Sequence, residues 1–150
     1  MEKVFENFAA VIMKLNKLIQ RIKQYEMRDY GLKAIHVMCV YHLNNHHEGL
    51  TSSELVRLTL EDKAAISRAL GVLQEKGYIV YDKNKYNTPV KLTDTGKELA
   101  GVILDRSSKA VEAGSANMPE EQRVMFYKFL GETADKLSEY YVSLCANDKK

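Results

Sequence analysis

The sequence predicts a mostly α-helical (α+β) fold, and three observations support this. Apolar residues recur at helical spacing through most of the 150-residue chain. Within residues 51–77, two capped amphipathic segments are separated by only Thr59-Leu60-Glu61, the short connection of a helix-turn-helix. Two β-prone segments then flank a polar tip at residues 78–92, as in a β-hairpin. Helix, turn, helix and hairpin in this order predict a winged helix-turn-helix with a two-stranded wing.

Length and composition predict one domain, residues 1–150. A composition of 45% hydrophobic and 28% charged residues is ordinary for a soluble globular protein. No apolar run approaches the ~18 residues of a membrane span, and the start MEKVFENFAA has no signal-peptide pattern. We therefore expect a cytoplasmic chain. Cys39 and Cys145 lie far apart and form no C-x-x-C, which predicts neither a disulfide framework nor a zinc knuckle.

The net charge of +2 is too small to indicate a nucleic-acid partner, but its distribution is informative. Residues 1–97 carry 15 Lys and Arg against 11 Asp and Glu, whereas residues 98–150 carry 7 against 9. The basic excess therefore lies with the helix-turn-helix and hairpin, and the slightly acidic C-terminal third would stay away from phosphates.

The first two predicted helices differ in how they should be covered. Residues 3–24 carry an apolar seam that a second surface must cover, either the domain's own body or a second chain. Residues 25–31 break this helix, and residues 32–43 form a helix that is apolar nearly all round and therefore central and buried. The seam consists of Val4, Phe8, Val11, Leu15, Leu18 and Ile22, widened by Phe5, Ile12 and Ile19.

Each helix of the helix-turn-helix has its own start signal. Thr51-x-x-Glu54 is a capping box that opens a short helix with Leu55 and Leu58 facing inward. Asp62 caps the second helix, and Gly77 stands where a left-handed residue ends a helix. The second helix has one apolar stripe, Ile66, Ala69, Leu70 and Leu73, and an opposite face without carboxylates, Lys63, Ala64, Ser67, Arg68 and Gly71.

The hairpin and the last two helices follow in order. Tyr78–Tyr81 and Val90–Leu92 are the expected strands around the tip 82–88, and Pro89 belongs at the hairpin's edge because it cannot donate to a ladder. Thr93 caps a long helix over residues 94–114. Asn117 and Pro119 start a last helix over residues 117–146, and residues 147–150 should fray. The seam of the last helix is Tyr127, Leu130, Ala134, Leu137, Tyr141 and Leu144.

The stretch LTSSELVRLTLEDKAAISRALGVLQEKGYIV, followed by VKLTDTGKELA, resembles the DNA-binding core of the MarR family of bacterial transcriptional regulators. The resemblance implies that residues 32–97 form the DNA-binding core, that 94–114 is a connecting helix, and that 3–31 and 117–146 interlock two chains as a homodimer. It further implies a pseudo-palindromic DNA site and, most often, a repressor relieved by a small aromatic or apolar ligand.

The expected DNA contacts follow from this arrangement. Side chains on the first turns of the second helix would reach base edges, and Arg68 is the best candidate for a bidentate contact to guanine. Ser52, Ser53 and Lys76 would meet phosphates. The family's wing carries an Asp-x-Arg, where this chain has Asn84 and Tyr86, so we expect a wing that contacts backbone and reads shape weakly. The full set is Ser52, Ser53, Lys63, Ala64, Ser67, Arg68, Lys76, Lys83, Lys85 and Tyr86.

Other kinds of site are less well supported by the residues. His42, His46, His47 and Glu48 are better explained as a solvated loop than as a metal site, and Cys39 as an inert buried thiol than as a redox sensor. No constellation for nucleophilic or metal catalysis stands out, so we expect neither an enzyme nor a cofactor. The alternative to a DNA-binding regulator is a winged-helix protein-interaction module with weak or lost DNA binding. Candidate residues of an effector pocket are Met13, Tyr25, Tyr30, His36, Met38 and Tyr41.

Overall fold

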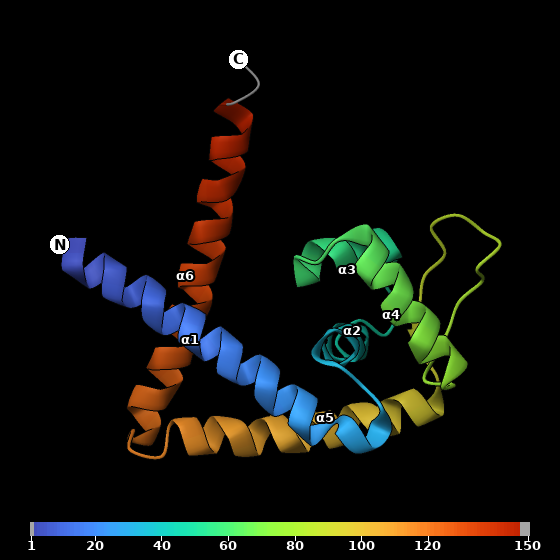
Figure 1. Ribbon diagram of the computed structural model, residues 1–150, viewed down its shortest axis with the longest axis horizontal. Coiled ribbons are helices and arrows are strands. Elements are labelled where there is room, and N and C mark those ends of the chain that lie inside the picture. The colour runs from blue at the N-terminus through green and yellow to red at the C-terminus, as the bar shows by residue number, and fades with distance from the viewer. Residues whose placement is uncertain (1, 148–150) are drawn as a thin grey trace. The chain divides into compact units, whose positions relative to one another are not determined.

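A computed structural model describes residues 2–147 and, except for Glu2, Val4 and Phe5, their side chains. It confirms a mostly helical fold with one two-stranded antiparallel sheet, and no described helix is long and apolar enough to cross a membrane. In order, the elements are α1 (Glu2–Glu26), the 3-10 helix η1 (Arg28–Tyr30), α2 (Ala34–Asn44), α3 (Ser52–Thr59), α4 (Lys63–Glu75), β1 (Ile79–Val80), β2 (Lys91–Leu92), α5 (Asp94–Gly114) and α6 (Glu120–Asn147) (Figure 1).

The chain forms two compact units, Met1–Ser107 and Ser108–Lys150. The first contains every element of the predicted helix-turn-helix and hairpin, and the second contains the end of α5 and all of α6. The prediction of a single domain over residues 1–150 stays a prediction. The predicted seam residues Val4 and Phe5 lie outside the described side chains, and most of the predicted frayed end, 148–150, lies outside the described residues.

Helix α2 is the centre of the first unit. It contacts α1, α3, α4 and β2, and five of its eleven residues are buried, among them Cys39 and Val40 at 0% exposure. The prediction of a central buried helix is confirmed. Its hydrophobic residues therefore provide a shared surface against which both α3 and α4 pack.

Both caps predicted for the helix-turn-helix form. The Glu54 backbone N–H donates to Thr51 Oγ1 (3.2 Å), and the Thr51 N–H donates to Glu54 Oε2 (2.8 Å). These hydrogen bonds, that from the Thr51 backbone first, hold the pKa of Glu54 below its usual value. Asp62 Oδ1 accepts from the Ala65 N–H (2.7 Å), and Gly77 has the left-handed φ of 77°.

The prediction of inward-facing apolar residues is confirmed for α4 but only in part for α3. All four stripe residues of α4, Ile66, Ala69, Leu70 and Leu73, are buried. On α3, Leu55 is buried, but Leu58 is 38% exposed, so the expectation that Leu58 faces inward was wrong. The eight-residue helix ends one residue later at Thr59, whose hydroxyl donates back to the Leu55 carbonyl (2.7 Å).

The sheet is shorter than the hairpin predicted from β-propensity. Ile79 pairs with Leu92 and Val80 with Lys91, whereas Tyr78 and Tyr81 lie outside the strand. Val90, expected in the returning strand, instead bridges to Leu50, with N···O distances of 3.1 and 2.8 Å. The loop before α3 therefore supplies the third chain segment at the base of the wing. Propensity alone does not reveal this pairing because it is non-local.

Candidate nucleic-acid interface

The outer face of α4 is exposed and basic. Lys63, Ala64, Ser67 and Arg68 are all exposed, while the residues between them on the helix face the core. These four lie in the first half of α4, where the aligned peptide dipoles give the helix its positive end. The face therefore offers donors and positive charge without a carboxylate among the four, as an anionic, acceptor-rich groove requires.

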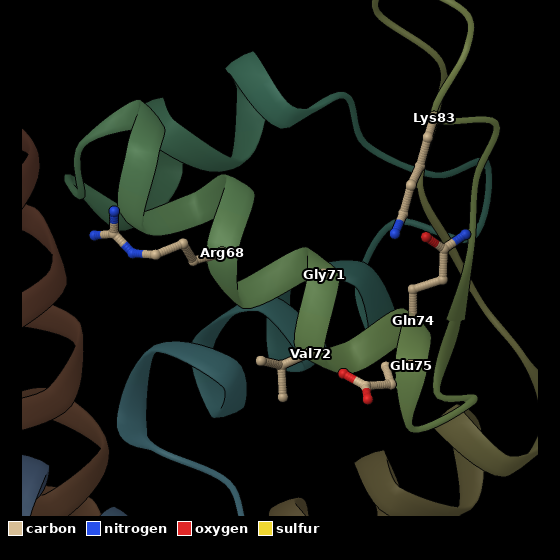
Figure 2. Close-up of a pocket in the computed structure, with 6 residues that line it drawn as sticks. All are labelled: Arg68, Gly71, Val72, Gln74, Glu75 and Lys83. Atoms are coloured by element: carbon tan, nitrogen blue, oxygen red, sulfur yellow. The ribbon is translucent and has the colours of Figure 1, made fainter.

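A hollow continues from this face toward the hairpin. It is lined by five residues of α4 and one of the wing, which we define as residues 81–90 (Figure 2). Gly71 leaves its middle open, because a Cβ added there would meet nothing within 4 Å. Figure 2 shows Arg68 before Gly71 along α4 and Lys83 directed from the wing toward Gln74, near the end of the helix. The lining residues are Arg68, Gly71, Val72, Gln74, Glu75 and Lys83.

The base of the wing is tied to α4 by a residue that sequence reasoning missed. Gln74 Nε2 donates to the Tyr81 carbonyl (3.1 Å), at the point where the chain leaves β1. The other amide atom, Gln74 Oε1, is buried without a hydrogen-bond partner among the described residues. No sequence signal marks this glutamine, since its partner is a backbone atom whose position depends on the hairpin.

The wing tip closes on itself. The Asn84 N–H donates to Asp82 Oδ1 (2.9 Å), and the Thr88 hydroxyl donates to the carbonyls of Lys85 (2.9 Å) and Asp82 (3.3 Å). Lys85 Nζ lies 3.7 Å from Asp82 Oδ2, an exposed ion pair. Tyr86 is 93% exposed and extends from the tip into solvent.

The remaining predicted contacts are distributed around these elements. Ser53 is exposed and Ser52 half-buried at the start of α3, where the helix N-terminus favours an anion. Lys76 is not on the α4 face: a Cβ built on Gly31 would lie 3.0 Å from its Nζ, so its side chain lies against the η1–α2 connection. The geometry therefore groups Lys63, Ser67 and Arg68, with Lys83 across the hollow, and separates Lys76 from them.

The six candidate effector residues occupy dissimilar environments. His36 is 6% exposed and accepts from the Lys33 N–H at Nδ1 (2.8 Å); burial, then the Lys33 and Lys76 charges, lower its pKa. Met13 is exposed on α1. Each of the other four has a neighbour: Tyr25 lies under Arg28, Tyr30 near Arg106, Met38 against Lys23 (2.8 Å), and Tyr41 edge-on to His42.

Two further sequence interpretations can be placed. Cys39 is fully buried, as predicted, and burial raises the pKa of its thiol to about 12, which disfavours the reactive thiolate. His46 Nδ1–H donates a hydrogen bond to the His42 carbonyl (2.8 Å). Between residues 2 and 147, no group of three or more His, Cys, Asp or Glu side chains is arranged to hold a metal ion.

Comparisons with known proteins agree with this geometry. Residues 30–84 match the sequence model of the MarR family. A comparison with curated proteins gave no match. Among solved structures, the chain is similar to a MarR protein from Peptoclostridium difficile (TM-score 0.81, 17% identity, 92% of each chain). It is also similar to a MarR transcriptional regulator from Methanosarcina mazei (TM-score 0.83, 20% identity, 89% of this chain and 91% of that one).

A third similar structure is a MarR family protein from Mycobacterium tuberculosis in complex with DNA (TM-score 0.69, 20% identity, 83% of this chain and 95% of that one). These identities are low, so the similar structures show the fold alone, and the sequence match covers the segment from η1 through α4 to the wing. The chain therefore matches the MarR family in sequence over residues 30–84 and shares the winged helix-turn-helix fold of the similar MarR structures over about nine-tenths of its length.

Proposed function

We propose that the protein is a homodimeric, sequence-specific DNA-binding transcriptional regulator that reads its site with α4. The observation that carries the proposal is the outer face of α4: Lys63, Ser67 and Arg68 are exposed together on a helix whose opposite stripe is buried. Arg68 provides a planar fork for guanine O6 and N7, worth ~1–3 kcal/mol of discrimination per good bidentate pair. The similar M. tuberculosis protein was solved in complex with DNA.

The exposed apolar side chains of two long helices, α1 and α6, support the proposed homodimer. In α1, Phe8, Val11, Leu15, Leu18, Ile19 and Ile22 are each between 38% and 48% exposed. In α6, no described residue is buried, although Phe126, Phe129 and Leu137 lie among its large apolar side chains. Apolar stripes of this length are a sign of a covered surface. A second copy offers the same stripes, so a twofold contact would bury both.

A twofold dimer has a consequence for the DNA site. Two copies of α4 would enter successive major grooves about one helical turn apart, ~34 Å. The site should therefore be pseudo-palindromic. We further propose repression relieved by a small aromatic or apolar effector, which the family resemblance favours. The effector must bind the DNA-competent and DNA-incompetent states with different affinities to shift their populations.

Selection from random-sequence duplex DNA tests the proposal. Wild type should enrich an inverted repeat with half-site centres ~10 base pairs apart. Arg68→Ala should lose about ten-fold or more in affinity for that repeat and relax the base preference at one position per half-site. Arg28→Ala is the matched control, because this exposed arginine of η1 already has Asp29 and the Tyr25 ring as neighbours and lies outside the α4 face.

The opposite outcome would favour the protein-interaction module. No enriched motif, together with equal and weak binding by wild type and Arg68→Ala, would overturn sequence-specific recognition by α4. Light scattering of the DNA-free protein tests the homodimer separately: a molar mass of one chain at micromolar concentration would contradict it.

A further inference from the structure

We propose that Arg106 is a positioning residue for DNA recognition: it fastens the end of α1 to α5 and thereby fixes the half-site spacing that the dimer accepts. The inference rests on the proposed function and names the part of the chain that controls the geometry of the DNA site. Arg106 touches no DNA in this proposal. It acts through the joint between α1 and α2, which we define as residues 27–33.

The joint is a short, well-anchored turn. The Met27 carbonyl accepts from the backbone N–H groups of Tyr30 (3.1 Å) and Leu32 (3.2 Å). Met27 and Leu32 are each 2% exposed, so both sides of the turn are anchored in the core of the first unit. The direction in which α1 leaves that core is therefore determined at its C-terminal residue, Glu26.

Arg106 contacts this joint from α5. Its Nη1 donates to the Glu26 carbonyl, which lies in the last turn of α1, where carbonyl groups have no partner within the helix. Its Nε lies 4.0 Å from Glu26 Oε2, and its Nη1 lies 3.8 Å from the Met27 sulfur. The guanidinium carbon lies 5.5 Å from the centre of the Tyr30 ring, within the range of a cation–π contact. One side chain thus joins α5 to α1, the joint and η1.

The buried face of α5 places Arg106 at this point. The buried residues of that helix are Gly96, Leu99, Ala100 and Ile103. Arg106 follows Ile103 by three residues and so lies on the same side of the helix. Its side chain is only 32% exposed. Because the first unit ends at Ser107, the contact occurs in the last turn of α5 that belongs to this unit.

A fixed joint matters because α1 and α4 have different tasks in the proposed dimer. Helix α1 carries an apolar stripe that a second copy would cover, and α4 carries the basic face that would read DNA. Each base pair added between the half-sites changes their separation by ~3.4 Å and their rotation by about a tenth of a turn. A stiff joint therefore makes the dimer selective for one spacing, and a loose joint makes it tolerant of several.

The test measures the spacing tolerance of the full-length protein. The inverted repeat obtained by selection is compared with the same repeat carrying one base pair more, or one fewer, between its half-sites. Fluorescence anisotropy would compare wild type with Arg106→Met, which keeps an unbranched side chain but removes every donor. Arg28→Ala is the matched control, because this exposed arginine of the joint contacts Asp29 and Tyr25 on its own segment and not α5.

Wild type and Arg28→Ala should bind the altered repeats about ten-fold or more weakly than the selected repeat, because one recognition helix then loses a base contact. Arg106→Met should reduce this ratio to about three-fold or less, since a loose joint lets both helices keep their contacts. Arg106→Lys keeps the charge without the planar fork, so its ratio should lie between the two. Urea unfolding checks that both variants are folded under the conditions of the assay.

The ratio separates positioning from a role in stability alone. Loss of folded protein would weaken binding to all three repeats by the same factor. An unchanged ratio in Arg106→Met, with Arg68→Ala still impaired on the selected repeat, would therefore overturn the inference alone. A single-chain molar mass for Arg106→Met where wild type is a dimer would also overturn it. Equal binding of selected and scrambled DNA by wild type would overturn the proposed function and this inference with it.

Discussion

Gly96, near the start of α5, sets how closely the hairpin approaches that helix. A Cβ added at Gly96 would lie 2.0 Å from the Tyr78 carbonyl oxygen, a backbone atom that cannot move aside cheaply. The same site is held by Thr93, whose hydroxyl donates to the Gly77 carbonyl (2.6 Å) and accepts from the Gly96 N–H (3.1 Å). The Thr-x-x-Gly pattern thus has a structural reason. Thr93 caps α5 by accepting from the Gly96 N–H, and Gly96 lacks the Cβ that would collide with the Tyr78 carbonyl.

The substitution Gly96→Ala should therefore lower the free energy of unfolding by about 2 kcal/mol or more, the range of a forced fit in a packed region. Gly101→Ala is the matched control in the same helix. A Cβ there would meet nothing within 4 Å, and alanine should raise stability by up to ~1 kcal/mol through helix propensity. Urea unfolding measures both. Equal effects of the two substitutions would contradict the close approach at Gly96.

At the scale of elements, the connection between α3 and α4 contains a residue in an unfavourable backbone conformation. Leu60 has the left-handed φ of 58° and is 87% exposed, so its side chain gains little from burial while the conformation costs roughly 1–2 kcal/mol for a residue with a Cβ. Leu60→Gly should raise the free energy of unfolding, by less than that cost because glycine also gains freedom in the unfolded chain.

Asn87→Gly is the comparison for this prediction. Asn87 also has a φ of 58°, but asparagine visits this region at less cost, so its replacement should change stability less than Leu60→Gly does. Thermal unfolding followed by circular dichroism measures both. A lower free energy of unfolding in Leu60→Gly would contradict this prediction and would mean that the exposed leucine side chain makes a stabilising contact.

The elements also differ in how far the sequence could predict them. The caps at Thr51 and Asp62 and the buried stripe of α4 depend on residues three or four apart, so local spacing sufficed. The strands did not follow from propensity, since Val90 pairs with Leu50, forty residues away. The Gln74–Tyr81 contact was missed for the same reason: the acceptor is a backbone carbonyl, and nothing in the glutamine's surroundings in sequence predicts it.

The candidate site shows the same division. The exposure of Lys63, Ser67 and Arg68 follows directly from the helical period, so the face could be predicted. The side on which Lys76 lies could not, because it sits beyond the last turn of α4 and its side chain follows the η1–α2 connection. The hollow between α4 and the wing also required the structure, since Lys83 reaches it only through the fold of the hairpin.

At the scale of the whole molecule, unfolding should depend on pH through the histidines of α2. Burial is the largest cause that lowers the pKa of His36 and of His42 below 6.5. The unfolded chain therefore binds more protons than the folded one below about pH 6.5, so stability is fully present above that pH and falls as the solution is acidified.

The measurement is urea unfolding between pH 7.5 and 5.5, a range above the titration of carboxylates such as Glu54, whose pKa is lowered further. His36→Gln removes one of the two groups, and glutamine can still occupy the third position of the α2 cap, where His36 accepts from the Lys33 N–H. The variant should lose stability less steeply than wild type on acidification. An unchanged slope would mean that His36 does not contribute.

The central claim is that α4 recognises a specific DNA sequence through Arg68. The most direct test is fluorescence anisotropy of the full-length protein on the selected inverted repeat and on a scrambled duplex, for wild type and Arg68→Ala across a salt series. We predict two chains per repeat, a steep salt dependence, and a loss of about ten-fold or more in Arg68→Ala on the repeat but not on scrambled DNA. Equal affinity of wild type for both duplexes, unchanged by Arg68→Ala, would contradict it.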